Sequence, residues 1–115
     1  MFKAPIDEQS ALGGRGPHSV VDVSDAFNWN DDKRGPRIGS YYTVLRGIDM
    51  EKVRVLVRDS APIVDQATIL KRVPTFNFVK VTFENLSAYI TADKNRNLRI
   101  TAEATSVKLY TPQQG

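Results

Sequence analysis

The chemistry that this sequence suggests comes from cations interleaved with aromatic side chains. A protein that binds one strand of nucleic acid needs cations for the phosphates and exposed aromatic faces on which unstacked bases can rest. Segments with strand composition carry both kinds of side chain, and so does the polar segment 25–39. We therefore take single-stranded nucleic acid, with single-stranded DNA favoured, as the leading candidate partner. The candidate binding residues are Trp29, Lys33, Arg34, Arg37, Tyr41, Tyr42, Arg46, Arg54, Arg58, Phe78, Lys80, Tyr89, Lys94, Arg96 and Arg99.

Each group of candidates also has a purely structural explanation, which the sequence leaves open. An antiparallel sheet with one solvated face places cations on that face and aromatic rings in the core. Trp29 could close one end of a barrel, and Asp31 and Asp32 would repel a phosphate group unless they face away from it. Lys94 and Arg96 could belong to an ordinary solvated turn.

Catalytic side chains are harder to find. His18 is the only imidazole, it lies in a segment rich in Gly and Pro, and the chain has no Cys and no recognisable Ser elbow to pair with it. The glycines of residues 13–16 lack the strand–loop–helix context of a phosphate-binding loop. Caps, turns and solvated loops explain the paired aspartates more simply than a Mg²⁺ site does. We predict a protein that is not an enzyme, with no catalytic residue, no metal and no cofactor.

Length and composition limit the class of protein. A chain of 115 residues fits one domain with a real hydrophobic core. The absence of Cys excludes thiol chemistry and Cys-ligated metal, and it is typical of proteins kept inside the cell. The N-terminal residues lack the apolar run of a signal peptide, and no segment approaches the roughly 18 apolar residues of a membrane span. We expect a cytoplasmic protein with no membrane partner.

The net charge of +3 is modest, but the charges are unevenly distributed. Residues 66–115 carry seven Lys or Arg against three Asp or Glu, whereas residues 1–65 carry nine against ten. The basic bias therefore falls in the C-terminal part, which is rich in expected strands.

Six segments have the composition of strands. Residues 52–58 are the clearest, because Val53, Val55 and Val57 recur at every second position. Residues 25–39 are polar and punctuated by Gly and Pro, which predicts a long loop. The expected strands are 19–24, 39–47, 52–58, 77–84, 86–91 and 98–110.

One segment, residues 59–72, has the period of a short helix. Asp59 or Ser60 can cap its N-terminus, Pro62 suits its first turn, and Pro74 follows its end. The expected buried face comprises Ile63, Ala67 and Leu70.

The N-terminal segment differs in composition from the rest. Residues 1–17 contain three Gly and two Pro and show little hydrophobic periodicity, which resists both a helix and a central strand. We expect an extended or mobile arm there, followed by one domain over residues 18–115.

With the segments 77–84 and 86–91 taken as one strand bent at Asn85, the order of expected elements is strand, strand, strand, helix, strand, strand. This order is that of the OB-fold, a five-stranded, partly open barrel that binds oligonucleotides on one face. Asn85 and a change of phase within residues 98–110 indicate that the last strands bend, as strands do when they curl into a barrel. We predict a mainly β protein, a small OB-like barrel of five or six strands with one short helix. SH3-like barrels, split sandwiches and an open sheet covered by the helix remain alternatives.

The C-terminal pair of segments also resembles a known group of proteins. Residues 79–90, the turn 93–97 and residues 98–109 look like the closing hairpin of small single-stranded-DNA-binding and replication-accessory proteins of bacteriophages and conjugative elements. The resemblance covers residues 41–115 and rests on strand layout, so it assigns no role to any numbered residue. It implies an OB-type barrel that coats or guides single strands during phage or plasmid replication, often as a homodimer. The tail 111–115 lacks the acidic, Phe-terminated tip of larger bacterial single-strand binders.

A second function class fits the same composition. The chain could be a protein–protein assembly module, a structural or accessory subunit of a phage or mobile element that binds no nucleic acid. Such a module would associate through an exposed strand edge or through Phe27 and Trp29. The choice between DNA and RNA, and the oligomeric state, stay open at this stage.

Overall fold

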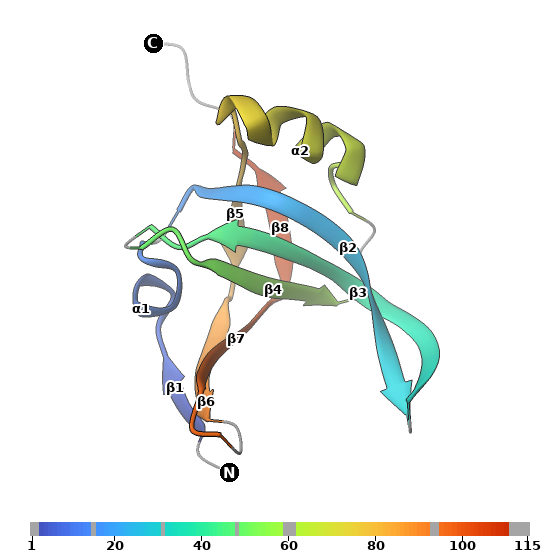
Figure 1. Ribbon diagram of the computed structural model, residues 1–115, viewed down its shortest axis with the longest axis vertical. Coiled ribbons are helices and arrows are strands. Elements are labelled where there is room, and N and C mark those ends of the chain that lie inside the picture. Colours follow the sequence, from blue (N-terminus) through green and yellow to red (C-terminus); the bar gives the residue numbers. More distant parts are fainter. Residues whose placement is uncertain are drawn as a thin grey trace.

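A computed structural model describes residues 3–14, 16–30, 32–47, 49–58, 62–92 and 95–110 of the chain. The protein is mainly β, as predicted, and its eight strands belong to one sheet (Figure 1). The elements in chain order are β1 Lys3–Ile6, α1 Glu8–Leu12, β2 His18–Asn30, β3 Lys33–Leu45, β4 Lys52–Arg58, α2 Gln66–Arg72, the short 3₁₀ helix η1 Val73–Thr75, β5 Val79–Glu84, β6 Ser87–Ala92, β7 Leu98–Ala104 and β8 Ser106–Leu109.

The strand order in the sheet is β1-β6-β7-β4-β3-β2-β5-β8, so β1 and β8 form its two edges. The neighbours β4 and β7 run parallel, and the other neighbours run antiparallel. The predicted OB-like barrel of five or six strands is not what the structure shows, because the described residues form one open sheet of eight strands. The predicted long strands are divided, and the last part, β8, has only four residues and one strand neighbour.

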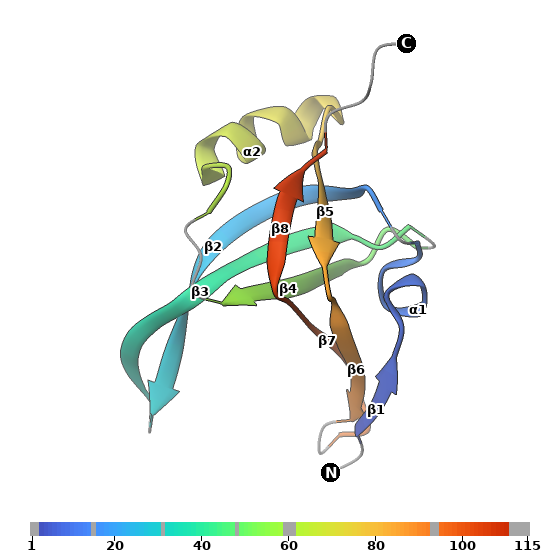
Figure 2. The same ribbon diagram turned by 180° about the vertical axis from the view of Figure 1, so that it is seen from behind.

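Two bends divide the C-terminal hairpin into an upper and a lower half. Asn85 separates β5 from β6 in the left-handed conformation, at φ 51°, which Asn tolerates better than most residues. Thr105 separates β7 from β8, and its backbone N–H donates to the Glu84 carbonyl at 3.0 Å. The bend predicted at Asn85 and the break predicted within residues 98–110 are thus confirmed. As a result β5–β8 continues the sheet beyond β2, and β6–β7 continues it beyond β4 (Figures 1 and 2).

The loop predicted over residues 25–39 is wrong, because β2 and β3 pair through most of it. Ala26 lies opposite Gly39, and Trp29 lies opposite Arg34. Register shifts interrupt the pairing beyond Ala26, and such bulges accommodate the Gly and Pro residues that suggested a loop. Gly39 is required here for another reason, since a Cβ at this position would overlap the Val57 carbonyl oxygen of β4.

The N-terminal segment is not the arm without regular structure that the sequence predicted. β1 pairs with β6 at the sheet edge, where Pro5 is tolerated. α1 follows, with the Asp7 carboxylate accepting a hydrogen bond from the Ser10 N–H at 2.8 Å. Ala11 and Leu12 are fully buried in the same core as the central strands. The core therefore includes residues that precede the expected domain boundary at 18.

The predicted helix is present but begins later. Asp65 caps α2, and its carboxylate accepts from the Thr68 N–H at 2.7 Å; the expected caps Asp59 and Ser60 lie outside the described residues. The helix packs on the core through Ile69, which is buried, whereas the predicted buried face of Ile63, Ala67 and Leu70 is exposed, and Ile63 precedes the helix.

The core is formed mainly by alternate residues of the central strands. The predicted strand 52–58 is confirmed with the same bounds, and Val53, Val55 and Val57 are buried. Within the ranges that the structure describes, no helix has the length and apolar character needed to cross a bilayer.

Candidate nucleic-acid interface

The outer face of the sheet around β4 gathers many of the predicted cations. Residues paired directly across a ladder project to the same side. Tyr41 of β3, Leu56 of β4 and Glu103 of β7 form one such row. Val53, Val55 and Val57 fill the core. The alternate residues Lys52, Arg54, Leu56 and Arg58 therefore project to the opposite, outer face of the sheet, together with Tyr41 and Glu103.

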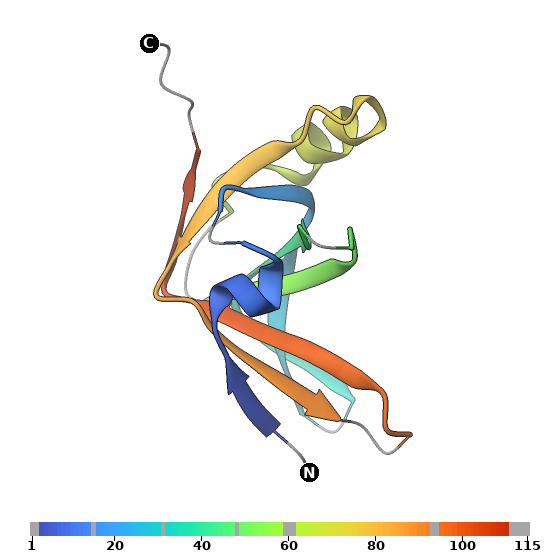
Figure 3. The same cartoon turned by 90° about the vertical axis from the view of Figure 1, so that its left-hand side faces the viewer.

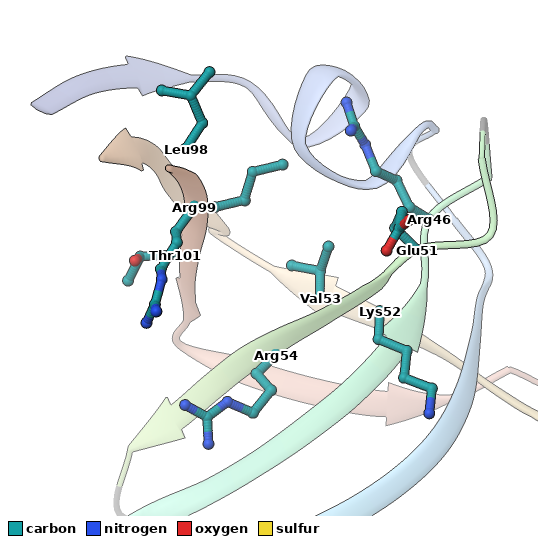
Figure 4. A pocket seen from close by; sticks show the side chains of 9 residues that line it. Arg46, Glu51, Lys52, Val53, Arg54, Leu98, Arg99 and Thr101 are labelled. Atoms are coloured by element: carbon teal, nitrogen blue, oxygen red, sulfur yellow. The ribbon is translucent and has the colours of Figure 1, made fainter. Parts of the chain in front are cut away.

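Two adjoining hollows of about 550 and 220 Å³ lie between β4 and its neighbours, and they share Arg54, Ile100 and Thr101. Figure 4 shows Lys52 and Arg54 projecting from β4, and Arg99 and Thr101 from β7. We name this surface the basic groove. Its lining residues are Tyr41, Arg46, Glu51, Lys52, Val53, Arg54, Leu56, Arg58, Leu98, Arg99, Ile100, Thr101, Ala102 and Glu103.

The basic groove has five cations and two carboxylates among these residues. One carboxylate is already engaged, since the Arg58 Nε donates to Glu103 Oε1 at 2.8 Å. Lys52 has no ionic partner among the described residues. The groove is therefore net positive and can accept an anion.

Arg54 and Tyr41 contact each other within the groove. The Arg54 guanidinium carbon lies 4.5 Å from the centre of the Tyr41 ring, in a cation–π contact. The contact holds a flat cation and an aromatic ring side by side, and both can stack on a base while the guanidinium contacts a phosphate.

Arg46 is held at the end of the groove nearest α1. Its Nη2 donates to the Ser10 carbonyl at 2.8 Å, and Nη1 lies 3.5 Å from the Asp49 carboxylate. The buried Nε has no hydrogen-bond partner. These contacts fix the guanidinium, so its charge contributes to the groove from a defined position.

The far end of the β2–β3 hairpin carries a second group of predicted residues. Trp29 is 62% exposed, so the alternative in which it closes a barrel is wrong. The Arg34 guanidinium carbon lies 4.6 Å from the Phe27 ring centre, and Lys33 is exposed nearby. Arg37 has a different role, because it donates to the Asp25 carboxylate at 3.0 Å and to Ser40 Oγ at 2.7 Å.

The hairpin and the β6–β7 ribbon project from the same end of the molecule, on opposite sides of β4 (Figures 1 and 2). Arg96 is exposed at the turn of β6–β7, whereas Lys94 lies outside the described residues. Tyr89 of β6 pairs with Thr101 and therefore adjoins the basic groove on the same face. The groove thus lies between two projecting two-stranded ribbons.

No known family model, curated protein or solved structure matches this chain.

Three further predicted binding residues lie neither in the basic groove nor on the two ribbons beside it. Tyr42 is fully buried, and its Oη accepts a hydrogen bond from the Ile63 N–H at 3.0 Å, so it cannot stack on a base. Burial raises the pKa of Tyr42, and the Ile63 hydrogen bond and the Arg37 charge oppose this in part. Phe78 and Lys80 line a separate groove between β5 and β8.

Among the groove residues whose side chains could donate to a phosphate, the sequence prediction missed Lys52 and Thr101. The alternation of residues 52–58 does contain a signal for Lys52, because it falls in phase with Arg54 and Arg58. Thr101 carries no such signal, since its position depends on the parallel pairing of β4 with β7.

His18 is buried and packs between α1 and the core. It is 4% exposed, its Nε2 lies 2.7 Å from the Glu8 carboxylate, and its ring stacks on Phe83 at 5.7 Å. Within the described ranges, no three acidic or imidazole side chains come together as a metal site would require.

Proposed function

We propose that this chain binds single-stranded nucleic acid, with single-stranded DNA favoured, through the basic groove. The observation that carries the proposal is the placement of Lys52, Arg54, Arg58, Arg99 and Tyr41 on the outer sheet face, around adjoining hollows whose end Arg46 also lines. Phosphate contacts supply most of the affinity of such proteins, and aromatic stacking adds about 1–3 kcal/mol per base.

The order of the elements supports an OB-type arrangement, which we propose as the finer description of the fold. β2, β3, β4, the bent ribbon β5–β6 and the bent ribbon β7–β8 correspond in order to five strands, with α2 between the third and the fourth. OB-folds are partly open, and they bind oligonucleotides on strands two and three and on the loops that follow strands one and four. The corresponding parts here are β3 and β4, the β2–β3 hairpin and the β6–β7 turn.

A single strand fits this surface better than a duplex does. Its bases can turn toward Tyr41 and Tyr89, whereas the bases of a duplex remain stacked on one another. The strand layout of the C-terminal half resembles that of phage and conjugative-element proteins, so replication of such an element is the setting that we propose.

An assembly role is the second candidate, and the two open edges of the sheet favour it. β1 and β8 each have one strand neighbour, and an unpaired edge can add a strand from another chain. This alternative predicts oligomers that tolerate salt, together with no affinity for nucleic acid.

Fluorescence anisotropy tests the proposed function with labelled oligo-dT, the matching duplex and oligo-rU. We expect oligo-dT to bind more tightly than the duplex, and we expect Lys52→Glu to weaken binding by about tenfold. Lys71→Glu is the matched control, because Lys71 is exposed on α2 and lines neither groove. Equal loss in both variants, or no binding of oligo-dT at low salt, would contradict the proposal.

A further inference from the structure

A second groove lies between β5 and β8, near the end of α2, and it is separate from the basic groove. Figures 2 and 3 show β8 running beside β5 at the side of the sheet where the chain leaves α2. This second groove encloses about 400 Å³, and none of its lining residues lines the basic groove. We name it the β5/β8 groove. Its lining residues are Arg72, Asn77, Phe78, Val79, Lys80, Leu109 and Tyr110.

The β5/β8 groove exposes large apolar side chains. Of its lining residues, Leu109 is 52% exposed and Tyr110 is 43% exposed. Beside the groove, Phe76 is 79% exposed, and its ring meets the Phe78 ring edge to face at 6.0 Å. Clustered apolar groups on a protein surface mark interaction sites, since their hydration is unfavourable. The groove therefore favours a ligand with a bulky apolar group.

The charges of the β5/β8 groove have one sign. Arg72 and Lys80 line it, and no carboxylate does. The Arg72 Nε donates to the Asn77 carbonyl at 2.7 Å, which orients the guanidinium. Lys80 has no ionic partner among the described residues. A ligand with carboxylates would complement this charge.

The backbone at the groove also favours a polypeptide. The Tyr110 N–H donates to the Lys80 carbonyl at 2.8 Å, which fixes the end of β8 against β5. β8 is an edge strand, so alternate backbone groups on its side away from β5 have no strand partner among the described residues. An extended peptide can hydrogen-bond such an edge, whereas a nucleic acid has no matching backbone pattern.

We propose that the β5/β8 groove binds an acidic peptide segment that carries a bulky apolar side chain. The apolar side chain occupies the space between Phe78 and Tyr110, and the carboxylates contact Lys80 and Arg72. A second copy of this chain fits less well, because a twofold contact would place the same two cations against each other. Since the two grooves share no lining residue, a protein partner and a nucleic acid can bind at the same time.

Anisotropy of short fluorescein-labelled peptides tests this inference on the full chain. The first peptide joins a run of aspartates to a leucine and a phenylalanine; one comparator replaces the aspartates with lysines, and the other replaces the two apolar residues with alanines. We expect the first peptide to bind about tenfold more tightly than either comparator, and its binding to weaken with salt. Equal binding of the three peptides, or binding of none, would overturn the inference.

Charge reversals locate the peptide and separate this inference from the proposed function. Lys80→Glu and Phe76→Ser alter exposed side chains, so both variants should fold. Each should weaken binding of the acidic peptide by about tenfold. Lys52→Glu, in the basic groove, should weaken binding of oligo-dT and leave peptide binding unchanged. Peptide binding that survives Lys80→Glu would overturn the inference.

Two other occupants would give different results. If oligo-dT displaced the peptide, and Lys80→Glu weakened oligo-dT binding as much as Lys52→Glu does, the β5/β8 groove would belong to the nucleic-acid surface. If Phe76→Ser converted a dimer to a monomer in sedimentation and no peptide bound, the occupant would be a second copy. Either result would overturn the inference.

Discussion

Among single side chains, Arg54 is the most informative residue of the basic groove. It lies at the junction of the two hollows and stacks on Tyr41 at 4.5 Å. A point charge at this position could contact a phosphate, but only a planar guanidinium can also stack on the ring or on a base. The role of Arg54 should therefore depend on its shape as well as on its charge.

Arg54→Ala should weaken binding of oligo-dT by about tenfold and lower the salt slope by about 0.7, the value for one phosphate contact on a single strand. Arg54→Lys should keep the salt slope of the unmodified chain but not its full affinity for oligo-dT. Anisotropy at several salt concentrations measures both quantities. If Arg54→Ala bound as tightly as the unmodified chain, the proposed role of the basic groove would be wrong.

Tyr41 and Tyr42 illustrate what sequence could settle about individual residues. Neighbouring residues of a strand face opposite sides, so no more than one of these two rings can lie on the binding face. The sequence could not decide which one, because both neighbours have the composition of either face. Packing decides it, since Tyr42 enters the core and Tyr41 lies beside Arg54.

The burial of Tyr42 predicts sensitivity to alkaline pH. Burial raises the pKa of Tyr42 in the folded protein, so folding favours the neutral phenol. This contribution to stability is complete below the ordinary pKa of about 10 and is lost as the pH rises through the higher folded value. Tyr42→Phe should cost about 1 kcal/mol at neutral pH, because the Ile63 N–H loses its acceptor, and it should reduce the alkaline sensitivity.

Urea unfolding of the unmodified chain and of Tyr42→Phe across neutral and alkaline pH measures both effects. Tyr41→Phe is the control, because Tyr41 lies on the outer face. A fall in stability that is equally steep in Tyr42→Phe would show that another group titrates.

Among the secondary-structure elements, those with strict alternation were predictable and those built on irregular pairing were not. Residues 52–58 form β4 with the predicted bounds, because one face of this strand is continuous Val. The β2–β3 hairpin was missed, since its Gly and Pro residues serve register shifts rather than a loop. α1 was missed because a helix of five residues is too short to display a period, and tertiary packing of Ala11 and Leu12 stabilises it instead.

The hairpin provides a prediction about Trp29. Its ring is largely exposed, so Trp29→Ala should change the free energy of unfolding by no more than about 0.5 kcal/mol. If the hairpin contacts the bound strand, oligo-dT should quench Trp29 fluorescence, and Trp29→Ala should weaken binding by about 1–3 kcal/mol. Binding that leaves both fluorescence and affinity unchanged would restrict the interface to the sheet face.

The contact between α1 and β2 provides a prediction about His18. This residue joins the Glu8 carboxylate to the Phe83 ring across the core, so His18→Ala should destabilise the protein by about 1–3 kcal/mol. Glu8→Gln should cost less, because the amide oxygen still faces the imidazole and the stacking on Phe83 remains. Chemical denaturation compares the two variants, and equal stability of His18→Ala and the unmodified chain would contradict this role.

For the whole molecule, the order of elements from β2 onward was predictable, whereas β1, α1 and the open form of the sheet were not. Periodicity along the chain marks strands and a helix, but it carries no information on which strands meet across the sheet. The pairing of β4 with β7 joins residues about half the chain apart, and it creates the basic groove from two strands that contribute cations separately. The same topology leaves β8 at an edge, beside the second groove.

The salt dependence of binding to oligo-dT, compared with the matching duplex, tests the role of the basic groove most directly. Three to five phosphate contacts predict that the logarithm of the association constant falls with the logarithm of salt concentration at a slope of about −2 to −3.5. We expect this slope for oligo-dT, with weaker binding of the duplex at every salt concentration. A titration that stays flat at low salt, or a duplex that binds as tightly as the single strand, would contradict the proposal that this protein binds single-stranded nucleic acid.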